Sequence, residues 1–237
     1  MNKFKVLFIV LLLFSLSTNL LPSSISASEE EPAEKVIYLT FDDGPGGKVT
    51  EKILDILKKE EVPATFFLIG NQIKGQEELV KRIHAEGHSL GLHSMSHEKS
   101  ILYSSNDNFL KEMLESQSKI KEVTGESPII LRFPFGCNNN CYKLKRTLVE
   151  LLHENNFKIY DWNVDSTDGA NYSASPSTFI KKAKSDSNPA VLLMHCGNMN
   201  KNSAAALPEI IKYYKNKGYT FKKIANETPE VFHYISN

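Results

Sequence analysis

VIYLTFDDGP, at residues 36–45, is the stretch from which the fold and chemistry of this chain can be argued. Its first six residues form a largely apolar run typical of a buried strand, and the closing Gly-Pro pair is a turn signal. Between these two signals lie the adjacent aspartates Asp42 and Asp43. Neighbouring side chains of a regular strand point to opposite faces, but where the strand breaks into a turn the carboxylates of both aspartates can reach one pocket. Two carboxylates on one rim repel each other unless a cation lies between them or one is protonated. The stretch therefore indicates a metal or proton-transfer site, with a plain turn as the alternative.

Strand-like and helix-like segments alternate along the rest of the chain. Strands are expected at residues 36–41, 64–69, 89–93, 129–133, 158–164, 190–195 and 219–224. Helices are expected at residues 49–59, 77–85, 108–124, 142–155, 176–184 and 204–216. Alternation without an obvious linker predicts a parallel sheet, and its length favours a barrel over an open sheet. The expected fold class is α/β, a distorted (β/α) barrel of about seven parallel strands.

The N-terminus has the pattern of a secretory signal peptide. Lys3 and Lys5 precede an apolar run at residues 6–16, and a polar, small-residue stretch ends near Ala27. An uncleaved membrane anchor is the alternative, although Ser15 and Ser17 interrupt the apolar run. The expected organisation is a signal peptide at residues 1–27, a short acidic leader at 28–35 and one folded domain at 36–237. A protein with this organisation is secreted or associated with the cell envelope.

The balance of charge argues against nucleic acid as a partner. The chain has 28 Lys and Arg residues and 28 Asp and Glu residues, and loss of residues 1–27 removes two lysines and no acid. A nearly neutral protein lacks the basic surface that nucleic acid requires. We also expect the protein to be a monomer.

Three cysteines, Cys137, Cys141 and Cys196, permit one disulfide in an exported protein. Cys137 and Cys141 are the simplest pair because they lie close together in the sequence. A bridge between Cys137 and Cys196 is an alternative, and three free thiols are another. The sequence does not choose among them.

Ionisable residues recur where the predicted strands end. They are Asp42 and Asp43, His93 and His97, Arg132, Asp165 and Asp168, and His195. Ligands of parallel α/β folds bind at the carboxyl ends of the strands, so successive strand ends of this kind indicate one shared site. Taken singly, His195 could be a core histidine, Arg132 a surface ion-pair partner, and the two later aspartates loop caps.

The segment HSMSH, at residues 93–97, places two imidazoles four positions apart. On a helical turn this spacing puts both rings on one face, which suits a single metal ion. An aspartate from another strand end can supply a third ligand and leave an open position for water, as in catalytic zinc sites. Non-haem iron oxygenases use a similar two-histidine, one-carboxylate set, but they do not need a second aspartate beside the ligand.

Five motifs appear in order: TFDDGP at residues 40–45, HSMSH at 93–97, RFPFG at 132–136, an aspartate-bounded segment at 165–168 and LMH at 193–195. Together they resemble the polysaccharide deacetylases, carbohydrate esterase family 4, whose catalytic unit is the NodB homology domain. The similarity covers nearly all of residues 36–237 and includes LPEII at 207–211 and GYTF at 218–221. Ordered motifs at these spacings are a specific match, whereas any one of them alone is weak.

The resemblance implies a metal centre and a base. Asp43, His93 and His97 would bind a divalent metal, most often Zn²⁺, with Co²⁺ or another divalent ion as alternatives. Asp42 would be the general base that takes a proton from metal-bound water, since zinc lowers the pKa of that water to about 7. Arg132 would pair with Asp42 and keep it ionised and aimed.

The resemblance also implies an acid and a substrate pocket. His195 would protonate the departing amine, and Asp168 would orient His195 and favour its protonated form. A backbone N–H near Phe135 would help the metal to stabilise the oxyanion of the tetrahedral intermediate. Leu193 would line the pocket for the acetyl methyl group.

Three positions depart from the family pattern. Phe135 stands where the family often has Tyr, Gly169 where it often has Trp, and Cys196 where it often has Asp. We interpret the last two as changes at the rim of the site, outside the ligands and proton carriers. Trp162 is interpreted as a core residue rather than a platform for sugar.

The predicted function is that of a secreted, metal-dependent polysaccharide N-deacetylase, which hydrolyses carbon–nitrogen bonds other than peptide bonds. Its expected substrate is an N-acetylated polysaccharide or oligosaccharide, with peptidoglycan first and chitin-type oligomers next. One alternative is a non-catalytic glycan-binding protein on a deacetylase scaffold, suggested by Gly169 and Cys196. Another is an esterase that acts on O-acetylated polysaccharide such as xylan.

Overall fold

The computed structural model describes residues 34–139 and 142–233 of the chain. The predicted signal peptide, most of the acidic leader and Cys141 lie outside the described residues. No helix within the described residues combines the length and the hydrophobicity that crossing a membrane requires.

Strands and helices alternate much as the sequence predicts. The strands are β1 (Val36–Gly44), β2 (Thr65–Leu68), β3 (Ser89–Leu92), β4 (Ile130–Leu131), β5 (Lys158–Ile159), β6 (Val164–Asp165), β7 (Ala190–His195) and β8 (Thr220–Lys222). The helices are α1 (Lys48–Glu60), α2 (Glu77–Ala85), α3 (Lys99–Leu102), α4 (Asn106–Thr124), α5 (Arg146–Glu154), α6 (Pro176–Lys182) and α7 (Lys201–Asn216), and a 3₁₀ turn, η1, lies at Gly70–Gln72. The short helix α3 is not among the predicted segments.

The eight strands form one sheet in the order β5-β4-β3-β2-β1-β7-β6, with β8 paired to the beginning of β1. Every pairing between these strands is parallel. The two end strands of the order, β5 and β6, do not pair with each other within the described residues, so the sheet curls into an incomplete barrel. The predicted α/β barrel of parallel strands is therefore confirmed, and the structure has one strand more than the seven predicted, because residues 158–164 form both β5 and β6.

The strand predicted at residues 158–164 is wrong as a single element, because it forms two strands at opposite ends of the sheet. The Tyr160 N–H donates to the Leu131 oxygen at 2.9 Å, beside β5. Further on, the Asn163 N–H donates to the Val191 oxygen at 3.2 Å, and β6 then pairs with β7. The chain therefore crosses from one end of the sheet to the other between these residues. A local apolar run does not reveal this, because each half satisfies its backbone groups on a different, distant strand.

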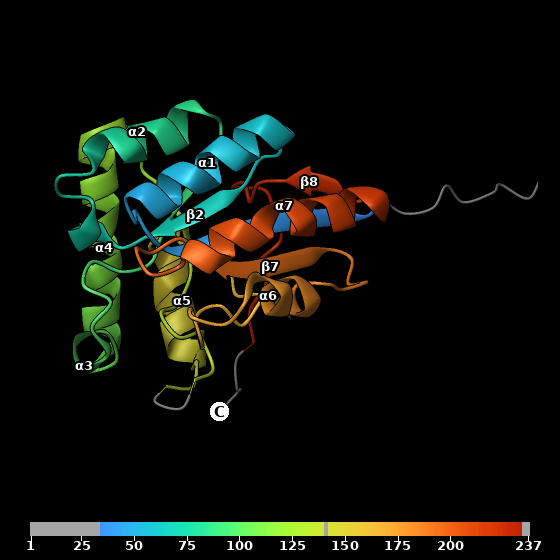
Figure 1. Cartoon of the computed structure of the whole chain (residues 1–237). Helices are drawn as coiled ribbons and strands as arrows, with labels where there is room; N and C mark the ends of the chain where they lie inside the picture. Colours follow the sequence, from blue (N-terminus) through green and yellow to red (C-terminus); the bar gives the residue numbers. More distant parts are fainter. Residues whose placement is uncertain (1–33, 140–141, 234–237) are drawn as a thin grey trace, which may run out of the picture. The chain divides into compact units, whose positions relative to one another are not determined.

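Helices cover the sheet because each has one apolar face. The buried residues of α1 include Val49, Ile53 and Leu57 at helical spacing, and those of α7 include Leu207 and Ile211. Helices α1 and α7 lie side by side, α6 packs against α7, and α4 packs against α2 and α5 (Figure 1). Burial of each such aliphatic side chain stabilises the fold by about 1.5–3 kcal/mol.

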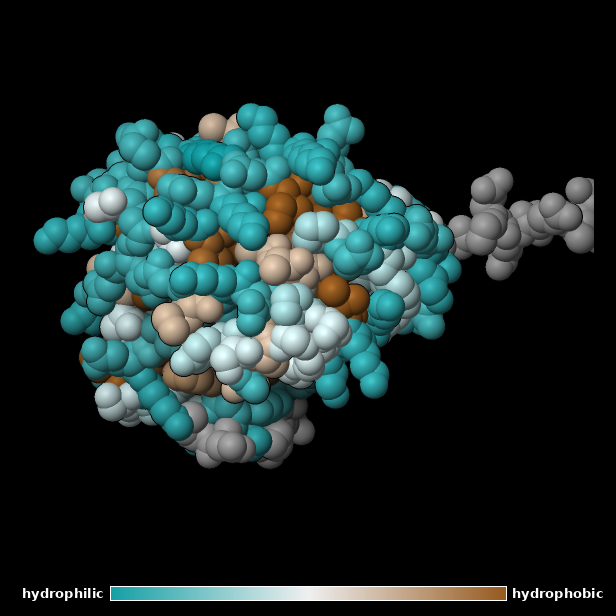
Figure 2. Space-filling view, in the orientation of Figure 1, coloured by the Kyte–Doolittle hydropathy of each residue, from teal (hydrophilic) through white to brown (hydrophobic). Residues whose placement is uncertain are grey.

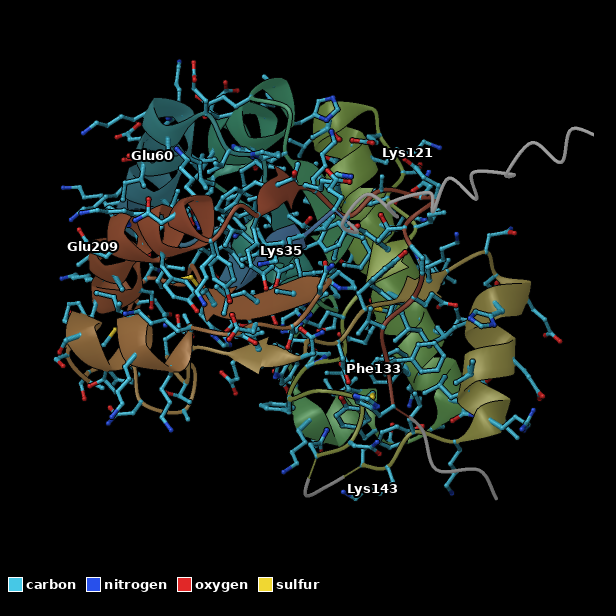
Figure 3. All side chains as sticks on the ribbon, turned by 90° about the vertical axis from the view of Figure 1, so that its right-hand side faces the viewer. Lys35, Glu60, Lys121, Phe133, Lys143 and Glu209 are labelled. Atoms are coloured by element: carbon cyan, nitrogen blue, oxygen red, sulfur yellow. The ribbon has the colours of Figure 1, made fainter. Side chains whose placement is uncertain are left out.

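Most polar side chains lie on the outer surface, but a few ionisable ones are buried at the carboxyl ends of the strands. The face seen in Figure 1 is mostly hydrophilic, with hydrophobic residues visible between the polar ones (Figure 2). Figure 3 shows Glu209 on the outer side of α7, whereas Phe133 lies in the interior and is fully buried. The buried ionisable residues Asp42 and Arg132 lie at the carboxyl ends of strands, where parallel α/β folds bind ligands.

Candidate active site

A bulge at the end of β1 brings two adjacent aspartates into one cavity. The register of β1 against β2 shifts between Phe41 and Gly44. Within the bulge Asp43 has a φ of 64°, in the left-handed region, so the regular alternation of side chains is broken there. Asp42 and Asp43 accordingly line the same cavity, as the Gly-Pro turn signal led us to expect.

Asp43, His93 and His97 form a group with the geometry of a metal site. The Asp43 Oδ1 atom lies 3.5 Å from His93 Nε2 and 3.4 Å from His97 Nε2. The possible ligand atoms all lie within 4.8 Å of one another. Ligand atoms at about 2.0–2.1 Å from a tetrahedral zinc ion are roughly 3.4 Å apart, so the two measured distances match such a site.

The protonation of this group also suits a cation. His93 Nδ1 lies 3.0 Å from the Arg132 backbone oxygen, which can only accept, so Nδ1 carries the hydrogen and Nε2 has a free lone pair. Burial, together with the neighbouring His97, lowers the pKa of His93 to about 3, so this ring is neutral. Asp43 Oδ1 is buried and has no hydrogen-bond partner among the described residues. Buried polar atoms are normally paired, and a cation would explain this one.

The loop that carries both histidines is not the helical turn that the sequence predicts. Ser94 and His97 have φ values of 68° and 59°, which a right-handed helix does not contain. The Ser94 hydroxyl accepts a hydrogen bond from the His97 N–H at 2.9 Å. The spacing of the histidines was therefore informative, but left-handed residues and a side-chain contact bring the rings together.

Glu112 holds this loop from α4, and the sequence analysis did not identify it. Its Oε2 atom accepts hydrogen bonds from the Met95 N–H at 3.1 Å, the Ser96 N–H at 2.7 Å and the Ser96 hydroxyl at 2.8 Å. The residue is buried beside Met113 on the inner face of α4. A carboxylate on the apolar face of an amphipathic helix is the signal that could have found it, because a buried carboxylate needs partners.

Asp42 is fixed in place by a buried arginine. Arg132 Nη1 donates to Asp42 Oδ1 at 2.9 Å, and both side chains are almost fully buried. Asp42 Oδ2 lies 3.8 Å from His93 Nε2, beside the candidate metal group. Burial raises the pKa of Asp42, and the Arg132 charge and hydrogen bond work against that rise. The alternative of a surface ion pair for Arg132 is therefore wrong.

Arg132 is itself held on all sides. Its other donors reach the Thr40 hydroxyl at 2.6 Å, the Tyr160 oxygen at 2.9 Å and the Asp161 oxygen at 3.0 Å. Its guanidinium carbon lies 4.3 Å from the centre of the Phe67 ring. This environment fixes the direction from which Arg132 approaches Asp42.

A second carboxylate–histidine pair lies on the other side of the same cavity. The ring atom His195 Nδ1 lies 2.7 Å from Asp168 Oδ1, and the backbone N–H of His195 donates to Asp168 Oδ2 at 2.9 Å. Burial opposes the charge on His195, but the hydrogen bond and charge of Asp168, together with Asp42 and Asp43, outweigh it and raise the pKa of His195 to about 9. Although burial disfavours the charged form of Asp168, the contacts with His195 lower its pKa. His195 is therefore poised to carry a proton.

One cavity of about 370 Å³ collects most of the predicted residues. Its lining includes Asp42, Asp43, His93, His97, Phe135, Leu193 and His195. Arg132 and Asp168 are not in the lining, but each contacts a lining residue directly. Asp165 also lines the cavity, and its carboxylate accepts from the Thr167 N–H at 2.7 Å, so it caps the local loop.

Comparison with known proteins identifies the family. A model of the polysaccharide deacetylase family matches residues 29–158, which is more than half of the chain. The chain belongs to the polysaccharide deacetylase family. The predicted family is thus confirmed.

Relatives of this polysaccharide deacetylase support the same conclusion. It is 38% identical over 216 residues to a peptidoglycan-N-acetylglucosamine deacetylase of Bacillus cereus, covering 87% of this chain and 74% of the relative. It is 35% identical to a peptidoglycan-N-acetylmuramic acid deacetylase of Bacillus subtilis, over 81% of this chain and 70% of that protein. A crystal structure of a Bacillus cereus polysaccharide deacetylase matches with a TM-score of 0.75 and 39% identity, covering 83% of this chain and 95% of the other. The predicted fold and enzyme class are confirmed.

Aromatic residues flank the cavity of this polysaccharide deacetylase. Phe135 is 49% exposed, and its ring centre lies 4.8 Å from that of His97. Trp162 lines the cavity as well and is only partly buried, so its interpretation as a core residue was wrong. Its position between β5 and β6, where the chain crosses the sheet, brings the ring to the site.

Two of the departures from the family pattern lie beside residues of the candidate site. Cys196 is fully buried, and its thiol lies 3.3 Å from the Asp42 backbone oxygen, so it is not at the rim as predicted. Gly169 is exposed, but a Cβ added there would lie 2.4 Å from His195 Cε1. Cys137 and Cys196 are not bonded to each other, so the alternative bridge between them does not form. The pair of Cys137 with Cys141 involves a residue outside the described ones.

Proposed function

We propose that this enzyme removes N-acetyl groups from amino-sugar polymers, with peptidoglycan as the first substrate and chitin-type oligomers next. The observation that carries the proposal is the convergence of a base, an acid and a cation-binding group on one cavity. Asp42 and His195 are directly paired residues of β1 and β7, which fixes the base and the acid relative to each other. The printed names of the relatives, which are deacetylases of peptidoglycan, support the choice of substrate.

Asp43, His93 and His97 would hold a divalent cation, with Zn²⁺ first and Co²⁺ or another divalent ion as alternatives. A carboxylate and two imidazoles are a donor set that zinc prefers. When bound, such an ion acts as a Lewis acid and lowers the pKa of coordinated water towards about 7. We assign His93 the firmest position, because the Arg132 carbonyl orients its ring.

The remaining residues move protons and position the substrate. Asp42 takes a proton from the attacking water while Arg132 keeps its carboxylate in place. A carbon–oxygen bond forms at the acetyl carbon, and the carbon–nitrogen bond then breaks. His195 gives its proton to the departing nitrogen, so the products are acetate and a free amine on the sugar. Asp168 keeps the ring of His195 in the orientation that presents Nε2 to the cavity.

Phe135 and Leu193 shape the pocket for the acetyl group. Leu193 is buried but still contributes to the cavity lining, which suits contact with a methyl group. Phe135 has a φ of 67°, and this unusual backbone conformation lies at the cavity. We assign its backbone N–H to the developing oxyanion.

We infer that the mature protein begins near Ala27 and acts outside the cytoplasm as a monomer, without a nucleic-acid partner. The pattern at residues 1–27 supports export, and a family match that begins at residue 29 agrees with a domain boundary near there. Peptidoglycan lies outside the cell membrane, so export and substrate are consistent with each other.

Acetate release tests the proposed function. Purified protein with added Zn²⁺ should release acetate from peptidoglycan oligomers and, more slowly, from chitin oligomers. Acetylated xylan separates the esterase alternative, because there the acetyl group leaves from oxygen. Glycan binding without acetate from any N-acetylated substrate would contradict the proposal and favour the non-catalytic alternative.

Glu112→Gln should weaken cation binding by about tenfold or more, because substitution of residues that orient metal ligands typically lowers metal affinity by about 10–100-fold. Glutamine keeps the shape of the side chain but loses the charge that holds the Met95 and Ser96 groups. Titration calorimetry of metal-free protein with Zn²⁺ measures the affinity directly. Glu115→Gln, an exposed residue of the same helix, is the control. Equal affinities for the two variants would show that Glu112 does not position the ligands.

A further inference from the structure

A second, larger cavity adjoins the candidate active site. Its volume is about 730 Å³, and it shares Asp43, His97, Gly169 and His195 with the smaller cavity. The candidate cation site and the proton carrier His195 therefore lie between two hollows. We call the second one the outer lobe, defined by its lining residues Asn71, Gln72, Lys74, Tyr172, Asn198 and Met199. Its size falls within the range of roughly 300–1,000 Å³ that is usual for ligand pockets.

Gly169 keeps the two hollows continuous. A Cβ at this position would lie 2.4 Å from His195 Cε1 and 2.6 Å from His195 Nε2. No side chain fits there while His195 keeps its contact with Asp168. The site is therefore open on both sides of His195, which suits a polymer that passes through rather than a single sugar that ends there.

Apolar side chains on the surface gather around the two hollows. Five large hydrophobic side chains are exposed among the described residues, and three of them, Phe135, Tyr172 and Met199, line one hollow or the other. Phe135 belongs to the smaller cavity, whereas Tyr172 and Met199 belong to the outer lobe. Exposed aromatic and apolar side chains beside a cleft are typical of binding sites. A sugar ring can pack on each side.

Several polar side chains of the outer lobe are not used by the fold. The side chains of Asn71, Lys74 and Asn198 make no hydrogen bond or ion pair with the other described residues. Lys74 is the only Lys or Arg in the described lining of either hollow. The carboxylates in those linings, Asp42, Asp43 and Asp165, all belong to the smaller cavity, and only Asp43 is shared.

We propose that the outer lobe binds the sugar next to the one that is deacetylated, and that Lys74 pairs with a carboxylate on that neighbouring sugar. This rests on the proposed function. Glycan strands of peptidoglycan alternate N-acetylglucosamine with N-acetylmuramic acid, whose lactyl group ends in a free carboxylate wherever the strand carries no stem peptide, whereas chitin carries none. Lys74 gives an acidic group a partner in the hollow whose lining includes only one of these three carboxylates. The substrate class is therefore an acidic amino-sugar glycan in preference to a neutral one.

The test compares two tetrasaccharides. One alternates N-acetylglucosamine with N-acetylmuramic acid that has free lactyl carboxylates, and the other is neutral chitotetraose. Lys74→Gln should lower kcat/KM for the acidic substrate by about three- to fivefold, the range of one exposed ion pair. The same variant should lower kcat/KM for chitotetraose by a smaller factor, and its effect on the acidic substrate should shrink as salt is added. Lys52→Gln, an exposed lysine of α1 that lines neither hollow, is the matched control.

Tyr172→Ala tests whether a sugar binds in the outer lobe, independently of the preference of Lys74 for an acidic sugar. It should weaken binding of both tetrasaccharides by a similar factor. Dissociation constants are measured by calorimetry on the same samples. Equal effects of Lys74→Gln on the two substrates, or none on the acidic one, would overturn the inference. A parent enzyme that releases no acetate from either would overturn the proposed function instead, and the dissociation constants would still decide the role of Lys74.

Discussion

Asp42→Asn should lower acetate release by about a hundred- to ten-thousandfold, because an amide cannot take the proton that the carboxylate accepts. Asparagine has nearly the same shape, so it tests the proton acceptor rather than the packing. The three proposed cation ligands are untouched, and Zn²⁺ should still bind at one equivalent. Rates of acetate release and calorimetric titration of the same sample separate these two effects.

The same substitution should also destabilise the fold. It removes the carboxylate that pairs with Arg132 at 2.9 Å, and Arg132 is fully buried. Loss of one partner from a buried pair costs about 3–5 kcal/mol, so the melting temperature must be followed and assays run well below it. Asp165→Asn is the matched control, because this aspartate lines the same cavity but is exposed and caps a loop. Full activity of a folded Asp42→Asn protein would remove the base from the mechanism.

His195→Gln should reduce acetate release by about a hundredfold or more, because the departing nitrogen then lacks a positioned proton donor. The exposed His153, which lies near Glu230 and away from the site, supplies the control His153→Gln. A substrate whose leaving group needs no proton would lose less rate than the amide. If both substrates lost the same factor, His195 would have a structural role rather than that of an acid.

The pH profile gives a second test of the same pair. His195 must be protonated to act, so activity should fall as pH rises through its pKa, which Asp168 raises from 6.5 towards about 9. A bound cation repels the imidazolium, so the alkaline limb of kcat/KM should lie between these two values. Asp168→Asn removes the stabilising carboxylate and should move this limb to lower pH. On the acid side, Asp42 must be ionised, and burial places that limb above the ordinary value of 3.8.

The sequence predicted which residues gather at this site better than it predicted their local geometry. Because the carboxyl ends of parallel strands meet at one edge, their places at strand ends were enough to predict that Asp42 and His195 share a site, although not that β1 and β7 pair directly. The prediction of a helical turn for HSMSH was wrong, because the shape of this loop depends on residues with left-handed backbone conformation and on Glu112 from the distant helix α4. Nothing within HSMSH indicates this contact, although the place of Glu112 on the buried face of α4 could have marked it as a carboxylate that needs partners.

Other differences between the predicted and the observed structure also arise from contacts between residues distant in the sequence. The split of residues 158–164 into β5 and β6, and the arrival of Trp162 at the cavity, depend on which distant strand accepts each backbone hydrogen bond. The burial of Cys196 follows from the packing of β7 against β1. Apolar periodicity reports which residues are inside, but it does not report which of them face a cavity.

The most direct test of the central claim is a titration of metal-free protein with Zn²⁺ while acetate release from a peptidoglycan oligomer is measured. If Asp43, His93 and His97 hold the one catalytic cation, activity should rise in proportion to added Zn²⁺ and level off at one equivalent. The variant His97→Ala should require far more Zn²⁺ to reach any activity. Acetate release that is independent of added and removed metal, or absent at every ratio, would contradict the account.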